Sequence, residues 1–376
     1  MIEWTSEQKL LQRTVHDFAQ KELLPKAAEI DEQETWNEIA FRKMADLGLL
    51  GITVSDEFGG IHLGATEATL VMETLGQACA STTLSYLAHS ILTVNNLFVN
   101  ASAEQKQRYL PKLISGEWLG AMAMTEPGAG SDALGMTTKA EKKGKKYLLN
   151  GSKTYITNGS YADVLIVYAR TGQNKKDIST FIVEKNFPGF RVSKKLKKMG
   201  MKGSPTAELS FDNCEVPEEN LIGAGNDSVA HMMNNLNMER ITISGISLGI
   251  AQACLDYSTR YAGERTQFGT PLSQFQMIQE RLAEMATSLA AGRALVYSAS
   301  RAFDKGQRPM SLGAQCKLFT AKMATQAGLD AIQILGGYGY MREYPVERMM
   351  RDAKLMEIGA GTNEVMRLII ARELYK

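Results

Sequence analysis

The spacing of apolar residues changes twice along this chain of 376 residues. In the first third, apolar residues recur every three or four positions, as at Leu11, Val15 and Phe18. This spacing places them on one face of a helix. Ser6 is a residue type that caps helix N-termini, so we predict that the first helix begins there. Residues 1–120 are therefore predicted to form an N-terminal helical domain.

Short runs of β-branched and aromatic residues replace this spacing after Gly120. Clusters of Gly, Asn, Lys and Asp separate the runs, which is typical of strands joined by turns. The predicted strands are residues 147–150, 164–168, 180–184 and 208–211. Strands this short and this closely spaced favour a compact β-barrel or sandwich domain at residues 121–226. The lysine-rich tract at residues 194–202 is predicted to be a solvated loop.

The helical spacing returns at Asp227 and persists over longer stretches. One predicted helix runs to Tyr261, and two more span residues 274–305 and 312–335. Brief turns join them, as expected for an antiparallel bundle. We therefore predict an α+β protein whose third domain, at residues 227–376, is a helical bundle.

Composition excludes several classes of protein. The net charge is +1, with acidic and basic residues interspersed, so nothing indicates nucleic-acid binding. Four cysteines lie far apart and four histidines are scattered singly, which predicts free thiols and no metal site. The first residues lack the basic and apolar runs of a signal peptide, and no apolar stretch is long enough to span a membrane. We expect a soluble protein of the bacterial cytoplasm or, in a eukaryote, of the mitochondrial matrix.

One carboxylate is conspicuous in the helix that follows Asp227. Apolar residues at steps of three and four form a row along this helix, and Glu239 is the only charge in the row. The apolar members are Met232, Leu236, Ile243, Ile246, Ile250, Ala253 and Tyr257. A buried carboxylate without a partner has a raised pKa, which suits a general base. Two other interpretations stay open: Glu239 pairs with a buried arginine, or the helix is rotated so that Glu239 meets solvent.

Two segments carry the most specific pattern in the chain. Residues 122–132 read Met-Ala-Met-Thr-Glu-Pro-Gly-Ala-Gly-Ser-Asp, and residues 155–159 read Tyr-Ile-Thr-Asn-Gly. Glycines let a backbone approach a flat or charged group, and the hydroxyls of Thr125, Ser131 and Thr157 can hydrogen-bond it. Each segment alone has the composition of a common surface turn. Their order and spacing together resemble the flavin-binding signature of the acyl-CoA dehydrogenase family, and the resemblance extends over nearly the whole chain.

The resemblance implies a fold, an assembly and a reaction. The family has an N-terminal helical domain, a middle β-domain and a C-terminal four-helix bundle, in the order predicted above. The resemblance implies a homotetramer with FAD between the β-domain and the bundle. It also implies α,β-dehydrogenation of an acyl-CoA thioester to the trans-2-enoyl-CoA. In that reaction a carboxylate removes the Cα proton, a hydride leaves Cβ for the flavin, and hydrogen-bond donors polarise the thioester carbonyl.

The C-terminal motif departs from the commonest form of the family. Many members carry the base in a Tyr-Glu-Gly-Thr motif, where this chain reads Gly-Ala-Gly-Thr at residues 359–362. Alanine in the place of the base cannot remove a proton. The isovaleryl-CoA dehydrogenase branch shares this sequence and carries its base in a Glu-Arg pair that resembles Glu239 and Arg240. The resemblance therefore implies that Glu239 is the base and that the substrate is a short branched acyl-CoA such as isovaleryl-CoA.

Three positions concern the acyl pocket. Gly359 stands where most relatives have tyrosine, which would leave space for a methyl branch. It could equally interrupt a helix before Thr362, a predicted N-cap. Leu92 and Ile243 match positions that close the pocket floor and indicate a short acyl chain, although each is also an ordinary core residue type.

The resemblance implies further contacts, residue by residue. The expected FAD contacts are Met122, Met124, Thr125, Gly130, Ser131, Tyr155, Ile156, Thr157, Arg265, Gln267, Phe268, Gln276, Gln333, Leu335, Gly336, Gly337, Thr362 and Glu364. The expected substrate contacts are Leu92, Ser131, Ser204, Asn237, Arg240, Ile243, Gly359, Ala360, Gly361 and Arg372. Residues 265–268 and 333–337 resemble segments that reach the FAD of a neighbouring subunit. Two departures stand out: Tyr155 replaces the usual tryptophan, and residues 229–230 replace a substrate-side tyrosine.

Other activities share this fold and give alternative readings. Acyl-CoA oxidases reoxidise the flavin with dioxygen, but they usually have a longer C-terminal half. Some relatives bind DNA or act as flavin-bearing scaffolds, and the near-neutral charge of this chain argues against DNA binding. The expected electron acceptor is electron-transferring flavoprotein. Isobutyryl-CoA, 2-methylbutyryl-CoA and longer branched thioesters stay open as substrates.

Overall fold

The N-terminal third is helical in this computed structural model, which describes residues 2–307 and 309–375. The helices are α1 (Ser6–Phe18), α2 (Ala27–Gln33), α3 (Glu38–Asp46), α4 (Ala65–Ala78), α5 (Ala80–His89), α6 (Asn96–Asn100) and α7 (Ala103–Ile114). Two π-helical segments interrupt them, η1 (Ala19–Leu23) and η5 (Ser90–Asn95). The predicted N-cap is wrong by one residue. Thr5 caps α1, because its hydroxyl accepts from the Gln8 N–H while the Gln8 side chain accepts from the Thr5 N–H.

The middle of the chain forms the β-domain. Its strands are β1 (Gly120–Ala123), β2 (Lys139–Lys143), β3 (Lys146–Thr157), β4 (Val164–Arg170), β5 (Ile178–Glu184), β6 (Phe190–Lys195), β7 (Thr206–Pro217) and β8 (Leu221–Ile222). They form one sheet in the order β6-β7-β3-β2-β4-β5-β8, and β1 pairs with β4 in parallel. Nearly every residue of β4 and β5 is buried, so both faces of the sheet are covered there.

All four predicted strands exist, each as part of a longer strand. Four others in this domain, β1, β2, β6 and β8, are not predicted. β8 has two residues, and the other three lack a clear signal. β1 reads Gly-Ala-Met-Ala and β2 reads Lys-Ala-Glu-Lys-Lys, so neither contains a β-branched or aromatic residue. β6 has two apolar residues, Phe190 and Val192, is exposed along almost its whole length, and ends in two lysines of the tract predicted to be a loop.

The C-terminal part is a bundle of long helices. They are α8 (Ser228–Glu264), α9 (Gln276–Asp304), α10 (Met310–Leu335), α11 (Val346–Met356) and α12 (Asn363–Glu373). A small hairpin of β9 (Thr266–Gln267) and β10 (Thr270–Pro271) joins α8 to α9. The three long helices match their predicted ranges to within a few residues. The domain boundaries at residues 120 and 226 stay predictions.

Helix α8 is more deeply buried than predicted. Every residue from 235 to 251 is buried, because α4, α9 and α10 pack along different sides of the helix. A Cβ added to Gly249 would lie 2.4 Å from the Glu73 carbonyl oxygen of α4, so glycine is needed for this close approach. The prediction of a single buried row on α8 is therefore wrong over these residues, although Glu239 lies within the buried part.

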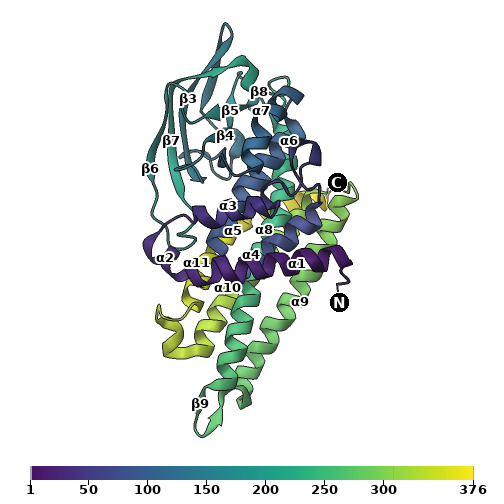
Figure 1. The fold of residues 1–376 in the computed structure, drawn as a ribbon, viewed down its shortest axis with the longest axis vertical. Coiled ribbons are helices and arrows are strands. Elements are labelled where there is room, and N and C mark those ends of the chain that lie inside the picture. Colours follow the sequence, from purple (N-terminus) through teal and green to yellow (C-terminus); the bar gives the residue numbers. More distant parts are fainter. Residues whose placement is uncertain (1, 308, 376) are drawn as a thin grey trace.

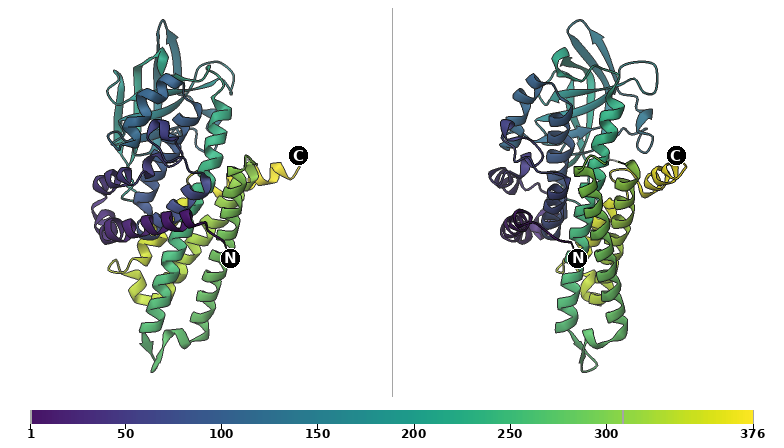
Figure 2. Two further views of the ribbon diagram at one scale, coloured as in Figure 1. Left: turned by 45° about the vertical axis from the view of Figure 1, so that its right-hand side comes forward. Right: turned by 90° about the vertical axis from the view of Figure 1, so that its right-hand side faces the viewer.

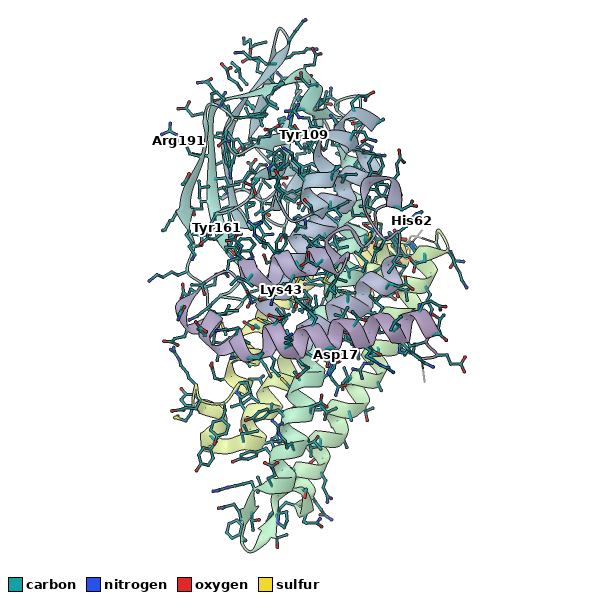
Figure 3. The ribbon with its side chains drawn as sticks, viewed as in Figure 1. Asp17, Lys43, His62, Tyr109, Tyr161 and Arg191 are labelled. Atoms are coloured by element: carbon teal, nitrogen blue, oxygen red, sulfur yellow. The ribbon has the colours of Figure 1, made fainter. Side chains whose placement is uncertain are left out.

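The long helices extend away from the β-domain. Figure 1 shows the β-domain at one end of the molecule and β9 at the opposite end, with α8 running between them. Figure 2 shows the C-terminal end of the chain projecting from the body. In Figure 3, Tyr109 of α7 lies in the β-domain half, where its hydroxyl donates to Glu184 at 2.8 Å, and Arg191 of β6 points outward. The two ends of the molecule are thus available for different contacts.

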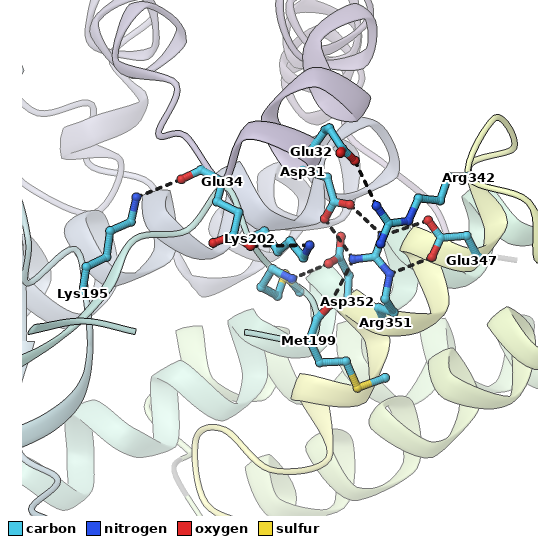
Figure 4. Close-up of polar contacts among 11 residues, drawn as sticks. Asp31, Glu32, Glu34, Lys195, Met199, Lys202, Arg342, Glu347, Arg351 and Asp352 are labelled. Atoms are coloured by element: carbon cyan, nitrogen blue, oxygen red, sulfur yellow. Dashed lines mark hydrogen bonds and ion pairs between the residues drawn. The ribbon is translucent and has the colours of Figure 1, made fainter. Parts of the chain in front are cut away.

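A polar cluster joins the three parts of the chain around α11 (Figure 4). Arg351 of α11 donates to both carboxylate oxygens of Asp31 in α2, at 3.0 and 2.6 Å. The same guanidinium donates to the Met199 carbonyl oxygen at 3.0 Å, and the neighbouring Asp352 accepts from the Met201 N–H. Two parallel bonds between arginine and a carboxylate fix both distance and direction. The cluster therefore holds α2 and the loop after β6 against α11.

The predicted solvated character of the lysine tract is wrong in part. Lys198 is half-buried and donates to the Ser204 carbonyl oxygen at 2.6 Å, and burial lowers its pKa to about 8. Lys202 forms an ion pair with Glu34 at 3.5 Å. The loop after β6 therefore packs against protein on one side.

The four cysteines are free, as predicted, and all are buried. Burial raises the pKa of the Cys214, Cys254 and Cys316 thiols to about 12, so these thiols are protonated and unreactive. Among the residues that the structure describes, none of the helices combines the length and the apolar composition that crossing a membrane requires.

Candidate active site

The predicted base lies buried in the first half of α8. Glu239 is 6% exposed, and its Oε2 atom has no hydrogen-bond partner in the described part of the chain. Burial raises its pKa to about 7, while Arg240 and Lys317 act in the opposite direction. A carboxyl group with a pKa near 7 can take up a proton at neutral pH, as a general base must. The interpretation that turns Glu239 to solvent is wrong.

The neighbouring Arg240 does not satisfy Glu239. Arg240 is 4% exposed, and its Nε and Nη1 atoms also lack a partner among the described residues. Burial lowers the pKa of Arg240, and the charge of Glu239 opposes this. Buried polar atoms without partners are rare in folded proteins. Two such groups side by side indicate a site that is completed by a bound molecule.

The loop before α12 has an unusual backbone. Ala360 has a positive φ of 56°, and Gly361 follows with a φ of 89°. The Ala360 N–H donates to no acceptor within the described ranges. Thr362 caps α12 as predicted, because its hydroxyl accepts from the Val365 N–H at 3.3 Å. Non-glycine residues in the left-handed region are strained and are concentrated at functional sites. The Ala360 N–H is therefore available to a ligand.

The two glycines beside Ala360 differ in whether the structure would accept a side chain in their place. A Cβ added to Gly361 would lie 2.8 Å from the Met366 Cε atom, and the positive φ disfavours any side chain. A Cβ added to Gly359 would make ordinary contacts only, the nearest at 3.5 Å from the Leu355 carbonyl oxygen. The backbone therefore requires glycine at 361 but accepts a Cβ at 359. The missing side chain of Gly359 leaves open space beside Ala360.

The two signature segments lie side by side in the β-domain. The Thr154 N–H of β3 donates to the Thr125 carbonyl oxygen at 2.8 Å. Asn235, near the start of α8, reaches the Met122 Sδ atom of β1 at 3.8 Å. The segments that resemble a flavin site are therefore joined to each other and to the helix that carries Glu239.

A buried ion pair holds these segments together. Lys153 of β3 donates to the Met124 carbonyl oxygen and to Glu126, both at 2.9 Å. Glu126 also accepts from the backbone N–H groups of Thr137 and Thr138, at 2.6 and 2.9 Å. Burial by itself would raise the pKa of Glu126, but Lys153 and these bonds hold it at about 2. Sequence reasoning missed the pair, whose one local signal is a charged residue at the centre of a strand.

The two signature segments are exposed to solvent on one side. Tyr155 is 71% exposed and has a φ of 58°. Thr125 and Thr157 are half-buried, and Cβ atoms added to Gly128 and Gly130 would meet nothing within 4 Å. An exposed aromatic ring, two hydroxyls and a bare glycine backbone fit the flat ring and the phosphates of FAD. Met122 and Met124 are half-buried here, Ile156 is buried, and Gly130 and Ser131 are exposed.

Other predicted FAD contacts lie at the opposite end of the molecule. Arg265, Gln267 and Phe268 surround β9, far from β3 in Figure 1, and Phe268 is 95% exposed. The Arg265 guanidinium lies over the Tyr338 ring, 5.5 Å from its centroid. It therefore lies close to the turn η9 (Gly336–Tyr340), which carries Gly336 and Gly337. A single chain does not bring this surface to the first signature segments.

The remaining expected contacts occupy several places. Leu92, which is 8% exposed, lies on η5, and Ile243, which is 3% exposed, lies one helical turn after Glu239. Both belong to an apolar cluster against which Ala360 packs. Ser204 and Asn237 are buried, and the Ser204 Oγ atom lacks a partner among the described residues. Leu335 is buried, whereas Gln276, Gln333, Glu364 and Arg372 are exposed.

Three domain models of one family cover the chain. Residues 5–117 match the acyl-CoA dehydrogenase N-terminal domain, residues 121–214 the middle domain and residues 228–375 the C-terminal domain. These matches and the fold define a flavoprotein oxidoreductase. The chain belongs to the acyl-CoA dehydrogenase family, whose members are typically homotetramers.

Similar proteins carry different names within this family. The chain is 47% identical over 374 residues to isovaleryl-CoA dehydrogenase, mitochondrial, of Pongo abelii, with 98% of this chain and 88% of that protein covered. It is 44% identical to 2-methylacyl-CoA dehydrogenase, mitochondrial, of Solanum tuberosum, with 98% and 90% covered. A chain from the structure of the electron transferring flavoprotein of Acidaminococcus fermentans has a TM-score of 0.98 and 39% identity, with both chains fully covered.

Proposed function

We propose that this chain catalyses the FAD-dependent α,β-dehydrogenation of a short branched acyl-CoA, such as isovaleryl-CoA, with Glu239 as the base. One observation carries the proposal. Glu239 is buried without a partner for Oε2 and has a pKa raised to about 7, whereas alanine occupies position 360, where many relatives have the base. The relatives named isovaleryl-CoA and 2-methylacyl-CoA dehydrogenase support a branched substrate.

The residues divide the proposed chemistry among them. Glu239 in its ionised form removes the proton from Cα of the thioester. The Ala360 N–H, which has no acceptor among the described residues, donates to the thioester carbonyl oxygen and stabilises the charge that develops there. FAD, when bound, accepts the hydride that leaves Cβ. Burial of Glu239 excludes water, which strengthens the electrostatic effect of each of these groups.

The proposed FAD site combines two subunits. Thr125, Ser131, Tyr155 and Thr157 would hold the flavin on the β-domain of one chain. The exposed surface at residues 265–268 and 336–337 lies around β9 and η9, at the end of the molecule away from β3 (Figure 1). This separation supports a homotetramer in which that surface contacts the FAD of a neighbour.

The acyl pocket is proposed to favour a short branch. Ile243 is buried on the helix of Glu239 and Leu92 on η5, which packs against that helix, and both would limit chain length. Gly359 has no side chain although its backbone would accept a Cβ, so the space beside it is available to a methyl branch. The same substrate class includes isobutyryl-CoA and 2-methylbutyryl-CoA. Initial rates on a panel of straight and branched acyl-CoAs would rank them.

The proposed electron acceptor is electron-transferring flavoprotein. The similarity to a chain in the Acidaminococcus fermentans structure supports this choice over dioxygen. Turnover with and without that flavoprotein distinguishes a dehydrogenase from an oxidase. Two relatives are described as mitochondrial, which supports a matrix location if the source is a eukaryote. A relative named acyl-CoA dehydrogenase comes from Bacillus subtilis, and we propose a cytoplasmic location if the source is a bacterium.

Replacement of the base tests the mechanism directly. Glu239→Gln preserves shape but removes the basic oxygen, so flavin reduction by isovaleryl-CoA should slow by at least about 10²-fold. FAD content and binding of the enoyl-CoA product should be kept. Glu264→Gln is the matched control, because Glu264 is exposed at the far end of the same helix. Reduction of Glu239→Gln at nearly the parental rate would show that another residue is the base.

A double variant tests the position of the base independently. Glu239→Gly combined with Ala360→Glu moves the carboxylate to the place that many relatives use. Part of the activity lost in Glu239→Gly should return, because both positions face the same Cα in the proposed complex. No recovery, with FAD content unchanged, would mean that the loop of Ala360 does not reach Cα.

A further inference from the structure

Lys317 is a buried cation that has no role in the reaction proposed above. It lies on α10 and is 2% exposed. Its Nζ atom donates to the Gly361 carbonyl oxygen at 2.7 Å and to the Asn363 Oδ1 atom at 3.3 Å. Within residues 2–307 and 309–375, its bonded acceptors are thus a carbonyl and an amide rather than a carboxylate. Burying an ammonium group without a carboxylate partner costs free energy. A neutral donor would therefore stabilise the loop better if the role of residue 317 were purely structural.

The contacts of Lys317 lie directly after the strained residue of the site. Gly361 follows Ala360, and its carbonyl oxygen is the one that Lys317 binds. A second tie comes from the Asn363 N–H, which donates to the Glu357 carbonyl oxygen at 2.9 Å. These two ties hold residues that precede and follow Ala360 in the loop. Removing the first would let the Ala360 peptide rotate out of its left-handed conformation, because that conformation is not a favoured one for alanine.

Lys317 lies on α10, which packs along α8, the helix of the proposed base. The charged or titratable neighbours that affect Glu239 are Arg240 on its own helix and Lys317 on α10, and Glu239 in turn raises the pKa of Tyr168 on β4. Burial lowers the pKa of Lys317 to about 8, and Glu239 gives the largest opposing effect. The ammonium form is therefore present at neutral pH, where Glu239 must be ionised.

The other groups around Lys317 contribute less. Glu357 at the end of α11 and Glu364 on α12 raise the pKa of Lys317, and Arg240 lowers it. Glu364 is exposed and pairs with Arg367 at 2.8 Å, so solvent and this partner weaken its effect. Of the described cations, Lys317 is the one that contacts the loop of Ala360 and also affects Glu239.

We propose that Lys317 is a positioning residue with two effects: it holds the Ala360 N–H in place for the thioester carbonyl, and its charge favours the ionised form of Glu239. The inference rests on the proposed function, because it assumes that Glu239 is the base. It adds a residue from a third helix to the site and explains why a cation is buried beneath the loop.

The test compares the pH dependence of flavin reduction in the FAD-loaded enzyme with isovaleryl-CoA. Lys317→Met keeps the apolar stem and removes the charge. The midpoint at which the rate rises with pH should move upward by about one unit, because the ionised base loses a nearby cation. The limiting rate at high pH should fall about tenfold, because the carbonyl donor is displaced. Lys317→Arg should restore the midpoint, and Lys322→Met, an exposed position on α10, should match the parent.

A second variant separates the two effects. Asn363→Ala removes one acceptor of Lys317 but keeps its charge. It should increase hydrogen exchange of the amides at residues 357–366 and leave the pH midpoint unchanged. A midpoint that moves equally in Asn363→Ala and Lys317→Met would show that only loop order matters and would overturn the electrostatic half. If Lys317→Met does not fold, Lys317→Gln, which keeps an N–H donor without the charge, replaces it.

The outcomes also distinguish this inference from the proposed function. A parental midpoint and a parental limiting rate in Lys317→Met, at equal FAD content and melting temperature, would refute the inference. If Glu239→Gln loses flavin reduction in the same series, the base assignment survives that result. If Glu239→Gln keeps the parental rate, the base assignment fails whatever Lys317 does.

Discussion

Two buried carboxylates in this molecule have opposite surroundings. Glu126 in the β-domain is 3% exposed and accepts hydrogen bonds from Lys153, Thr137 and Thr138, which hold its pKa at about 2. Glu239 in the bundle is 6% exposed, lacks a partner for Oε2, and has a pKa raised to about 7. The side chains are of one type and the burial is similar, so the partners alone make the difference.

The comparison shows how to distinguish a structural carboxylate from a reactive one. A carboxylate with a full set of donors is fixed in its charged form and holds the chain together. A carboxylate without them is costly to bury, and its proton is easily gained and lost at neutral pH. Glu126 and Lys153 therefore build the proposed flavin site, whereas Glu239 is available for the chemistry.

Breaking the paired carboxylate should have the largest effect. Lys153→Met leaves Glu126 charged and unpaired, which should lower the free energy of unfolding by about 3–5 kcal/mol and reduce the FAD content. Denaturant unfolding of the apoprotein measures the first and flavin absorbance the second. The control is Lys146→Met on the same strand, whose exposed pair with Glu215 at 2.7 Å should contribute at most about 1 kcal/mol. Equal losses in the two variants would contradict the comparison.

Neutralising the unpaired carboxylate should instead stabilise the fold. The pKa of Glu239 is raised from 4.5 to about 7, so the folded state holds this proton more tightly than the unfolded state. Its favourable contribution is full below pH 4.5 and is lost as pH rises through 7. Glu239→Gln should therefore be more stable than the parent at pH 8, by up to about 3 kcal/mol.

The pH dependence of the stability gain in Glu239→Gln tests this explanation. The difference in the free energy of unfolding between Glu239→Gln and the parent should shrink between pH 7 and 5 and be small near pH 4.5. Glu264→Gln, on the exposed end of α8, should show no such trend. A gain that is independent of pH would mean that glutamine packs better, rather than that a buried charge is removed.

The smallest expected effect concerns the space beside Ala360. Gly359→Tyr should fill the room that a methyl branch would use, so kcat/KM for isovaleryl-CoA should fall more than that for butyryl-CoA. The discrimination should be about 1–3 kcal/mol, or 10- to 200-fold. Gly359→Ala is the mild control, because an added Cβ makes only ordinary contacts. Equal losses on both substrates would show that position 359 affects the loop rather than the pocket.

The sequence predicted what depends on local pattern. The three long helices, the cap at Thr362 and the burial of Glu239 all follow from spacing or residue type over a few positions. The cap at Thr5 was misplaced by one residue because Ser6 is an equally good capping type. The all-round burial of α8 was missed because it depends on helices from both ends of the chain.

Partners that are distant in sequence could not be predicted. Lys153 and Lys317 contact residues 27 and 44 positions away, respectively, and nothing in their local sequence names those partners. The family resemblance identified the signature residues but did not identify the buried cations Lys153 and Lys317. The sequence also could not predict that Arg265 and Phe268 lie at the far end of the molecule, away from Tyr155. Their position depends on the length and direction of α8 (Figure 1).

The Arg351 cluster affects how the protein unfolds. Because Arg351 on α11 bonds both α2 and the loop after β6, none of these segments can open without breaking bonds to this side chain (Figure 4). Segments tied in this way lose their structure as one cooperative unit rather than one after another. A protease should therefore find few cleavage sites at residues 196–205 until this unit has unfolded, although the loop has the composition of a flexible linker.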